Sequence, residues 1–430
     1  MAAWVNWSRM QRCEPATFER PGSAAEVAGA VERAAAAGRT VRAAGAGHSF
    51  TGAVLTGGTL LSLDRMGRVL DADPASGLVR VEAGITLHRL SRELHVRGLA
   101  LPNLGDIDAQ SVAGAIATGT HGTGARLPNL SAQVEAVELV LGDGSVRELT
   151  AADGDLLLAA RVGLGALGVV VAVTLRCVPA FRLHGLDRPE PLGDVLASLD
   201  ERADAADHFE FWTFPHSPLA LTRTNTRTEA DRELPGRARE WTEDVLMDNH
   251  VFGMLNRVAR RVPRAIPGLN RAMARAASRR ERVDWSFRIF ASPRLVRFTE
   301  MEYAVPRESA ADAVRGARAI LERHAVSFPV ELRLVAADDA LLSPAHGRDS
   351  AYVAVHVFEG VPWQSPFREV EALMGSLGGR PHWGKWSFLT AAGLAGRYPA
   401  WDAFQAARRE LDPGGRFENE WVRRVLGAAP

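Results

Sequence analysis

The most constraining feature of this sequence is a turn of small residues that follows a short apolar strand expected at Thr40–Ala43. It reads Arg42-Ala43-Ala44-Gly45-Ala46-Gly47-His48-Ser49-Phe50. Small residues let backbone N–H groups come close to a ligand, and consecutive N–H groups in a tight turn attract anions such as a pyrophosphate. A histidine on the turn would face the same ligand. The alternative is a glycine-rich surface turn with a solvated histidine, and this stretch alone does not decide between them.

A second stretch of small residues, Ser111–Gly124, reads SVAGAIATGTHGTG and combines four glycines with hydroxyl side chains and a histidine. So small a sequence is not expected to pack an ordinary core face. Glycine there serves close backbone approach, and the hydroxyl and N–H groups supply hydrogen bonds. Two such stretches in one N-terminal half predict a large ligand with phosphates and a flat ring.

These stretches, with Gly165–Val170, resemble the FAD-binding domain of the vanillyl-alcohol-oxidase flavoprotein superfamily. Near the other end, Glu331-Leu332-Arg333 with the following Ala336-Ala337-Asp338, and Arg380–Lys385, resemble its sugar-oxidising branch, the aldonolactone oxidases and alditol oxidases. The resemblance covers nearly the whole chain in the same order. It implies an α+β fold of two domains, a PCMH-type FAD-binding domain and a substrate domain built on an antiparallel sheet.

The resemblance also implies which residues hold FAD. A bond between the flavin and His48 is expected, because sugar oxidases of this branch carry a histidine after Gly-x-Gly and before Ser; the alternative is a histidine that only hydrogen-bonds the cofactor. The full set of expected cofactor-binding residues is Arg42, Gly45, Ala46, Gly47, His48, Ser49, Ser111, Gly114, Thr118, Gly119, His121, Gly122, Gly168 and Val170. No metal site is expected.

The segment Gly163-Leu164-Gly165-Ala166-Leu167-Gly168 is a literal GxGxxG motif. A nicotinamide-binding fingerprint needs a strand before it and a helix after it. Here a helix is expected at Asp153–Arg161 and a strand at Val169–Leu175, the reverse order. We therefore reject the nicotinamide interpretation and expect a turn where backbone closely approaches the flavin or its adenosine part.

Three further groups carry the expected chemistry. Glu331 and Arg333 alternate with Leu332, so both side chains leave one face of a strand; a surface ion pair is the plain alternative, but the resemblance places them at the flavin ring. Lys385 is expected to stabilise negative charge on the reduced flavin, with His382 beside it or on the substrate. His356 and Ser111 are expected to contact the substrate, although a structural role suits His356 equally well.

The substrate class follows less directly. Alditol oxidases are expected to carry a small hydroxylated residue two positions after His356, where this chain has Phe358. Phe211, Trp212 and Phe214 also suggest an apolar wall, which suits a compact ring better than an extended polyol. The sequence therefore favours oxidation of a sugar-derived 1,4-lactone, with oxygen or another acceptor reoxidising the flavin. The alternatives are an alditol oxidase and, in another class, a non-catalytic flavin-binding partner protein.

Composition excludes several classes. Lys+Arg and Asp+Glu are both 51, so the chain lacks the basic excess of a nucleic-acid binder. Its two cysteines, Cys13 and Cys177, form no CxxC pair, which fits a reducing cytoplasm. Neither a signal peptide nor an apolar run long enough to span a membrane is expected.

We expect the FAD-binding domain at residues 1–179, joined by the tail at about 395–430, and the substrate domain at 180–394. Strands are expected at Phe209–Phe214, Leu219–Thr224, Arg288–Phe290, Met301–Val305, Val330–Val335 and Ala351–Phe358, and a helix at Glu308–His324. An insertion at about 231–284 is expected to be helical and solvated. The alternative is a surface that contacts anionic lipid or a partner, because it carries Arg257, Arg260, Arg261, Arg264, Arg271, Arg275, Arg279, Arg280 and Arg282 against few acids.

Overall fold

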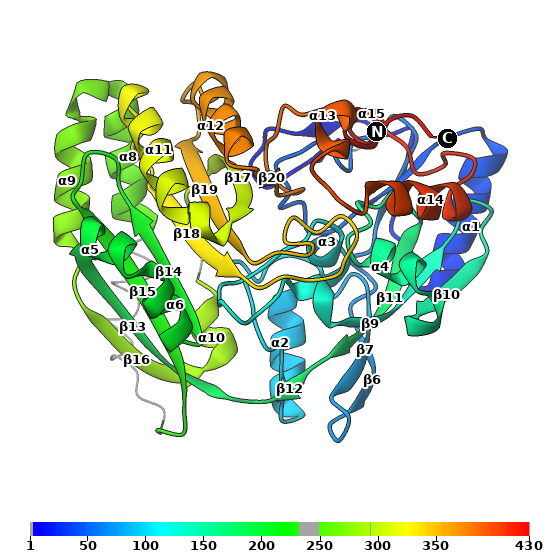
Figure 1. Cartoon of the computed structure of the whole chain (residues 1–430). Coiled ribbons are helices and arrows are strands. Elements are labelled where there is room, and N and C mark those ends of the chain that lie inside the picture. Colours follow the sequence, from blue (N-terminus) through cyan, green and yellow to red (C-terminus); the bar gives the residue numbers. More distant parts are fainter. Residues whose placement is uncertain (1–2, 232–248, 293, 430) are drawn as a thin grey trace.

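The computed structural model describes residues 3–231, 249–292 and 294–429. Its N-terminal half holds two sheets (Figure 1). The smaller is parallel, in the order β3 (Thr17–Glu19), β5 (Thr59–Ser62), β4 (Val41–Ala44). The larger is antiparallel, in the order β10 (Val146–Thr150), β9 (Val134–Val140), β11 (Val169–Arg176), β7 (Leu78–Glu82), β6 (Val69–Asp73). Two short pairs complete it, β1 (Trp4–Val5) with β2 (Arg12–Cys13) and β8 (Leu99–Ala100) with β12 (Val178–Pro179).

Some helices of this half begin after a residue whose side chain caps them. Helix α1 (Ala24–Ala36) starts after Ser23, whose side chain accepts a hydrogen bond from the Glu26 amide. Helix α2 (Leu87–Val96) starts after Thr86 in the same way. The other helices are α3 (Val112–Ala117) and α4 (Asp155–Arg161), with short 3-10 turns η1 (Leu130–Gln133) and η2 (Ala151–Asp153).

The C-terminal tail packs into the N-terminal core. Helices α13 (Ala391–Ala395), α14 (Trp401–Leu411) and α15 (Glu420–Leu426) lie beside the N-terminal half (Figure 1). Phe404 of α14 is fully buried in one apolar cluster with residues of α2, α3 and β9. The loop 336–349 also joins this cluster, through Leu341 and Leu342, although it lies between two strands of the other half.

The cap half is built on one eight-stranded antiparallel sheet. Its order is β16 (Arg280–Trp285), β13 (Arg182–Pro191), β15 (Leu219–Thr228), β14 (His208–Thr213), β18 (Val330–Val335), β19 (Ser350–Phe358), β17 (Phe298–Pro306), β20 (Arg380–Pro381). Helices α5 (Leu192–Ala197), α6 (Leu199–Ala205), α11 (Ala310–Arg323) and α12 (Gln364–Ser376) cover one face, with η5 (Arg307–Ser309) leading into α11. The expected antiparallel sheet backed by helices is confirmed.

The two faces of this sheet differ sharply in chemistry. The face toward α11 and α12 is apolar; Phe211, Met301, Leu332 and Val353 belong to a single buried cluster with those helices. Period-two alternation sends the intervening residues to the other face. That face carries the buried groups Glu210, Glu300, Glu302, Glu331 and His356, together with the partly buried Arg333.

Several local expectations were wrong. Arg288–Phe290 lies in helix α10 (Ser286–Phe290), not in a strand, and the second glycine stretch contributes α3, whose Val112, Ala115 and Ile116 are core residues. The insertion is helical at α8 (Phe252–Arg261) and α9 (Ile266–Ala276), with a 3-10 turn η4 (Pro263–Ala265) between them, but its last residues form β16 and extend the sheet. Residues 232–248 of the insertion lie outside the described residues. Among the described helices, none combines the length and apolar character that crossing a bilayer requires.

Candidate active site

The first glycine turn leaves β4 and offers amide groups to a ligand. In the described part of the chain, the amides of residues 46–49 donate to no backbone acceptor. The ring of His48 stacks on Trp7 at 5.6 Å between centroids, and burial together with the nearby Lys385 charge lowers the pKa of His48. A Cβ on Gly45 would lie 2.2 Å from Ser111 Oγ. Glycine is therefore required there for the two small-residue stretches to meet.

The loop that carries His382 and Lys385 packs against this turn. The carbonyl of Gly384 accepts hydrogen bonds from the Phe50 amide (2.8 Å) and from Ser49 Oγ (3.2 Å). The indole Nε1 of Trp383 donates to the Leu342 carbonyl at 2.6 Å, which fixes the loop to the N-terminal core. The structure thus brings His48 and Lys385 into one neighbourhood, although they are more than 330 residues apart in the sequence.

The second stretch contributes side chains rather than the free helix amides expected of a phosphate site. Ser111 caps α3 and accepts from the Gly114 amide (3.3 Å), while the next two amides, of residues 112 and 113, donate to the Ile85 and Ala83 carbonyls. Thr118 Oγ1 donates to the Gly114 carbonyl and faces the Gly384 loop. Gly119 adopts φ +72°, a conformation that favours glycine.

Four residues expected at the cofactor are used by the protein itself. The buried Arg42 guanidinium donates to the carbonyls of Ala53, Leu164, Gly165 and Phe417. Its donors are largely consumed, so we correct its assignment to a structural one, and the GxGxxG turn closes on Arg42. Gly122 and Gly168 serve close packing, because a Cβ would lie 2.3 Å from Asn103 Oδ1 in the first case and 3.0 Å from the Val140 carbonyl in the second. Val170 packs against the N-terminal core clusters.

Glu331 and Arg333 lie on one face of β18, as the alternation predicted, and that face is buried. The Arg333 guanidinium contacts the Glu331 carboxylate. Burial raises the pKa of Glu331, while Arg333 and His356 oppose the rise. His356 Nε2 lies 3.8 Å from Glu331 Oε2. The pair is therefore not a surface ion pair.

Glu300 of β17 joins two further predicted site residues. Lys385 Nζ donates to Glu300 Oε2 at 2.5 Å, and His356 Nε2 lies 3.4 Å from Glu300 Oε1. The register of β17 and β19 sets Glu300 directly opposite His356. Burial alone would lower the pKa of His356 and of Lys385, but the Glu300 carboxylate raises both. Burial would also raise the pKa of Glu300, but Lys385 and His356 hold it at about 2.

Glu302, two residues on, joins the histidines of both halves. His121 Nε2 lies 3.2 Å from Glu302 Oε1, and ligand atoms of His121, Glu302 and His382 lie within 4.8 Å of one another, a spacing that could hold a metal ion. However, His382 Nδ1 accepts from the Gly384 amide (3.0 Å), and burial lowers the pKa of His382 to about 3. A neutral His382 therefore carries its proton on Nε2 and presents a donor there rather than a metal-binding lone pair.

The apolar wall lies only partly where it was expected. Trp212 shares the charged face of the sheet, where it lies opposite Glu331 with the Arg223 guanidinium 5.2 Å from its ring centroid. Phe211 faces the helices, and Phe214 is buried against Phe252 of α8, so neither lines that face. Instead, Phe298 meets the ring of His356 at 5.1 Å, and Phe328 meets it at 6.2 Å. Phe358 stacks on Phe328 and completes the wall.

Sequence reasoning missed five charged residues of this site: Asp106, Glu210, Arg223, Glu300 and Glu302. The signal for the last two was present, because Glu300 and Glu302 alternate with apolar residues in a strand and so share a face. Nothing in the sequence indicated Asp106, which lies in the loop between β8 and α3 and reaches the cap sheet only through the tertiary fold.

Comparison with known proteins agrees with this geometry. Residues 173–425 match the sequence family described as D-arabinono-1,4-lactone oxidase, and residues 15–150 match a family described as FAD binding domain.

The chain belongs to the D-arabinono-1,4-lactone oxidase family.

Its relatives include the L-gulono-1,4-lactone dehydrogenase of Mycobacterium tuberculosis, 46% identical with 99% of each chain covered. The L-gulonolactone oxidase of Mus musculus is 34% identical, with 98% of this chain and 97% of that protein covered. The alditol oxidase of a Streptomyces species is 34% identical, with 99% of each covered. A cholesterol oxidase from Brevibacterium sterolicum shares the fold, with a TM-score of 0.82 at 18% identity and coverage of 99% and 96%.

The cofactor of this family member is FAD, and the residues present fit it. The amides of residues 46–49 are without backbone acceptors in the described part of the chain and suit phosphate or ring oxygens. The ring of His48 is neutral at pH 7 because its pKa is lowered, and Lys385 lies close enough to contribute to that shift. The first glycine turn, Ser111, Thr118 and the Gly384 loop would hold the cofactor from several sides.

We predict that Glu300 controls the protonation of His356. In Glu300→Gln the charge and the hydrogen bond that favour the imidazolium are lost, so the midpoint of His356 titration should move from above its ordinary value of 6.5 to below it, as burial then dominates. The measurement is NMR of ring-¹³C-labelled histidine, with the signal assigned through His356→Gln. Glu302→Gln is the matched control, because Glu302 faces His121 instead; a shift of His356 in the control but not in Glu300→Gln would refute the assignment.

Proposed function

We propose that this chain oxidises a CH–OH group of a sugar-derived 1,4-lactone. The observation that carries the proposal is the meeting of Glu331, Arg333 and His356 from the cap sheet with Lys385 beside the His48 turn. Buried ionisable groups with shifted pKa values are typical of catalytic sites. Relatives named as lactone dehydrogenases and oxidases support the substrate class.

The residues of the site have different roles in the proposed reaction. Bound FAD supplies the acceptor for the hydride that leaves the carbinol carbon. Glu331 takes the hydroxyl proton, because burial raises the pKa of this carboxyl above its ordinary value. His382 is a poorer base, since its pKa is lowered to about 3. Ser111 Oγ accepts from an amide and keeps its own proton to donate to substrate or cofactor.

Positive charge for the developing alkoxide comes from Arg333 and Lys385. The Glu300 carboxylate offsets much of the Lys385 charge, which the sequence did not indicate. Lys385 therefore acts as a positioned hydrogen-bond donor as much as a free cation. His356, whose pKa is raised, adds a second protonated donor at the same place and supports the predicted contact with substrate.

A lactone suits this site better than an alditol. Phe298, Phe328 and Phe358 form an apolar wall beside His356, which favours a compact ring over an extended chain of hydroxyls. The Streptomyces alditol oxidase keeps the second candidate open. A flavin-binding partner protein without turnover would have no need of the buried Glu331–Arg333 pair.

The test is anaerobic reduction of the flavin by L-gulono-1,4-lactone, D-arabinono-1,4-lactone and xylitol in stopped flow. We expect bleaching of the flavin absorbance with a lactone at a rate that exceeds the rate with xylitol. Fast bleaching by xylitol alone would establish the alditol oxidase, and an inert flavin with every donor would establish the non-catalytic protein. We propose that oxygen or another acceptor reoxidises the flavin. Return of the flavin absorbance after air is admitted would identify oxygen as an acceptor.

Glu331→Gln serves as the internal control for this experiment. Loss of a general base lowers rates by about 10²-fold or more, and the amide keeps the shape of the side chain. Its thermal midpoint should stay within a few degrees of wild type. Flavin reduction at the wild-type rate in Glu331→Gln would show that Glu331 has no role in the chemistry.

We propose that the FAD is covalently attached to His48. The support is a ring with a lowered pKa, which is neutral and nucleophilic, on a turn with unused amides. Acid-precipitated protein should stay yellow, and a tryptic peptide containing His48 should carry the mass of FAD. His48→Ala should release its flavin on precipitation. Release of all flavin from the wild type would leave only a noncovalent role for His48.

We also propose that the cap half contacts anionic lipid through the outer side of α8. Met254, Val258 and Val262 recur every fourth residue and are 51%, 43% and 51% exposed. Residues 249–280 contain eight arginines and no acid. An apolar stripe flanked by arginines suits the interface of an anionic bilayer. Helices α8 and α9 lie at the end of the cap half away from the N-terminal half (Figure 1), so docking would leave the site free.

Co-sedimentation with phosphatidylglycerol vesicles tests this surface. The double variant Arg257→Glu/Arg261→Glu should lower the bound fraction roughly tenfold or more, since each basic residue near such a surface contributes about 1 kcal/mol. Arg89→Glu/Arg92→Glu on α2, also exposed, is the matched control with the same net charge. Equal loss in both variants, or no binding by the wild type, would contradict the proposal.

A cytoplasmic location is a further part of the proposal. Its support is that Cys13 and Cys177 are free thiols rather than a disulfide. Recovery of the native protein from a secreted fraction would contradict it.

A further inference from the structure

Four strands of the cap sheet align charges of alternating sign in one row. The register sets Asp187 of β13 opposite Arg223 of β15, Arg223 opposite Glu210 of β14, and Glu210 opposite Arg333 of β18. All four side chains lie on the face away from α11 and α12. Side chains directly opposite one another on a sheet are close enough to pair, so the row ends at the arginine of the proposed active site.

The contacts along the row are well formed. Arg223 binds Asp187 in a bidentate manner, with Nε and one terminal nitrogen each 2.8 Å from a carboxylate oxygen. Arg223 also lies 3.7 Å from Glu210 Oε1. Arg333 Nε donates to Glu210 Oε2 at 2.8 Å. A bidentate arginine is fixed in direction as well as in distance, so the row holds Glu210 in place to receive Arg333.

A residue from the N-terminal half closes the row. Asp106 Oδ2 lies 2.6 Å from a terminal nitrogen of Arg333 and accepts a hydrogen bond from Arg294 at 2.8 Å. Its carbonyl accepts the Ser292 amide at 3.1 Å. Arg333 therefore has one carboxylate partner on its own sheet, Glu210, and one from the half that binds FAD, in addition to its neighbour Glu331.

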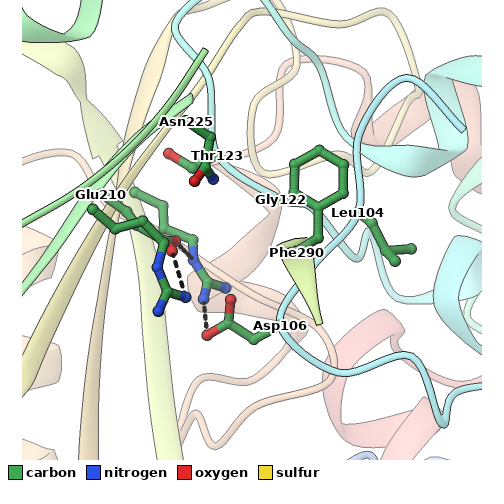
Figure 2. A pocket seen from close by; sticks show the side chains of 9 residues that line it. Leu104, Asp106, Gly122, Thr123, Glu210, Asn225 and Phe290 are labelled. Atoms are coloured by element: carbon green, nitrogen blue, oxygen red, sulfur yellow. Dashed lines mark hydrogen bonds and ion pairs between the residues drawn. The ribbon is translucent and has the colours of Figure 1, made fainter. Parts of the chain in front are cut away.

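Figure 2 shows the small cavity where these groups meet, with Asp106 and Glu210 joined to the arginines by dashed contacts. Phe290 and Leu104 line its other side. The adjoining backbone is held across the two halves: the Gly124 amide donates to the Leu334 carbonyl at 2.7 Å, and Thr123 Oγ1 accepts from the Leu334 amide at 3.2 Å. Asp106 thus approaches Arg333 at a place where the halves are firmly joined.

The charges explain why Asp106 and Glu210 are both tolerated beside the Arg333 guanidinium, which also contacts Glu331. Although burial would raise it, Arg333, Arg294 and Arg223 hold the pKa of Asp106 at about 2. Burial and the Asp106 charge raise the pKa of Glu210 to about 7. At neutral pH Asp106 is therefore fully ionised, whereas Glu210 is partly protonated.

We propose that Asp106, supported by Glu210 of the same row as Arg333, is the positioning residue that fixes the Arg333 guanidinium for catalysis. Arg333 would then be correctly aimed only when the two halves are docked and Asp106 is ionised beside it. This inference rests on the proposed role of Arg333 in lactone oxidation.

The test is a double-mutant cycle between positions 106 and 333 in the FAD-loaded protein. Anaerobic reduction by L-gulono-1,4-lactone gives the limiting rate and the lactone Kd for wild type, Asp106→Asn, Arg333→Gln and the double variant. In the wild-type background, Asp106→Asn should lower the ratio of limiting rate to Kd by about tenfold or more. In the Arg333→Gln background, the same substitution should change this ratio less than about threefold, because the effects of coupled residues are not additive.

Arg294→Gln is the matched control, because Arg294 shares Asp106 Oδ2 without touching Arg333. If Asp106 only docks the two halves, Arg294→Gln should reproduce the loss, and Asp106→Asn should act equally in both backgrounds; either result overturns the inference. If Arg333→Gln alone reacts like the wild type, the proposed role of Arg333 fails and this inference falls with it. A failure of the inference alone leaves Arg333→Gln slow and the cycle additive.

A second variant guards against a folding defect in Asp106→Asn. Glu210→Gln keeps shape and an acceptor for Arg333 Nε, and it enters the same cycle with Arg333→Gln; a loss of less than tenfold is expected, because Glu210 is already partly protonated at pH 7. Thermal midpoints and flavin content are measured for each protein. If both variants fail to yield folded, flavin-loaded protein, the row has a folding role only and the inference is overturned.

Discussion

Burial of charge between the two halves is the constraint on which the rest of this structure depends. A charged group that leaves water loses several kcal/mol of solvation unless a partner of opposite sign and satisfied hydrogen bonds replace it. The cap sheet places Glu210, Glu300, Glu302, Glu331 and Arg333 on one buried face. Each of these carboxylates has a cationic or histidine partner on another strand, on its own strand or in the other half, so the sheet register and the docking of the halves must both be correct for the charges to be tolerated.

This constraint also explains the different faces of the sheet. Toward α11 and α12, Phe211, Met301 and Leu332 belong to an ordinary apolar core, and burial of apolar surface is the dominant favourable term in folding. The opposite face is then free to hold chemistry, because its residues are not needed for that core. Period-two alternation separates the two tasks within single strands, so a shift of one residue in β18 would exchange Glu331 for Leu332.

Much of this arrangement could be predicted from the sequence, and the limits are physical. The first glycine turn, the loop of His382 and the pair Glu331–Arg333 were predicted because each is local in sequence. Glu210 and Asp106 could not be predicted, since their partners are set by strand register and by a loop that crosses between the halves. Arg42 was misassigned for the same reason: its four carbonyl acceptors come from segments far apart in the sequence.

Many ions lie on the buried face of the cap sheet, where apolar residues could pack instead. Replacing buried ion pairs by well-packed apolar groups is often neutral or stabilising, so stability does not account for Asp187, Arg223 and Glu210 lying in sequence with Arg333. A guanidinium surrounded by fixed carboxylates has few alternative orientations, and a site that is oriented in advance reorganises little during the reaction. Lys385 follows the same rule, since Glu300 restrains it and reduces its free charge. The carboxylates beside Arg333 and Lys385 thus reduce the effective positive charge of each side chain, and in return they fix its orientation.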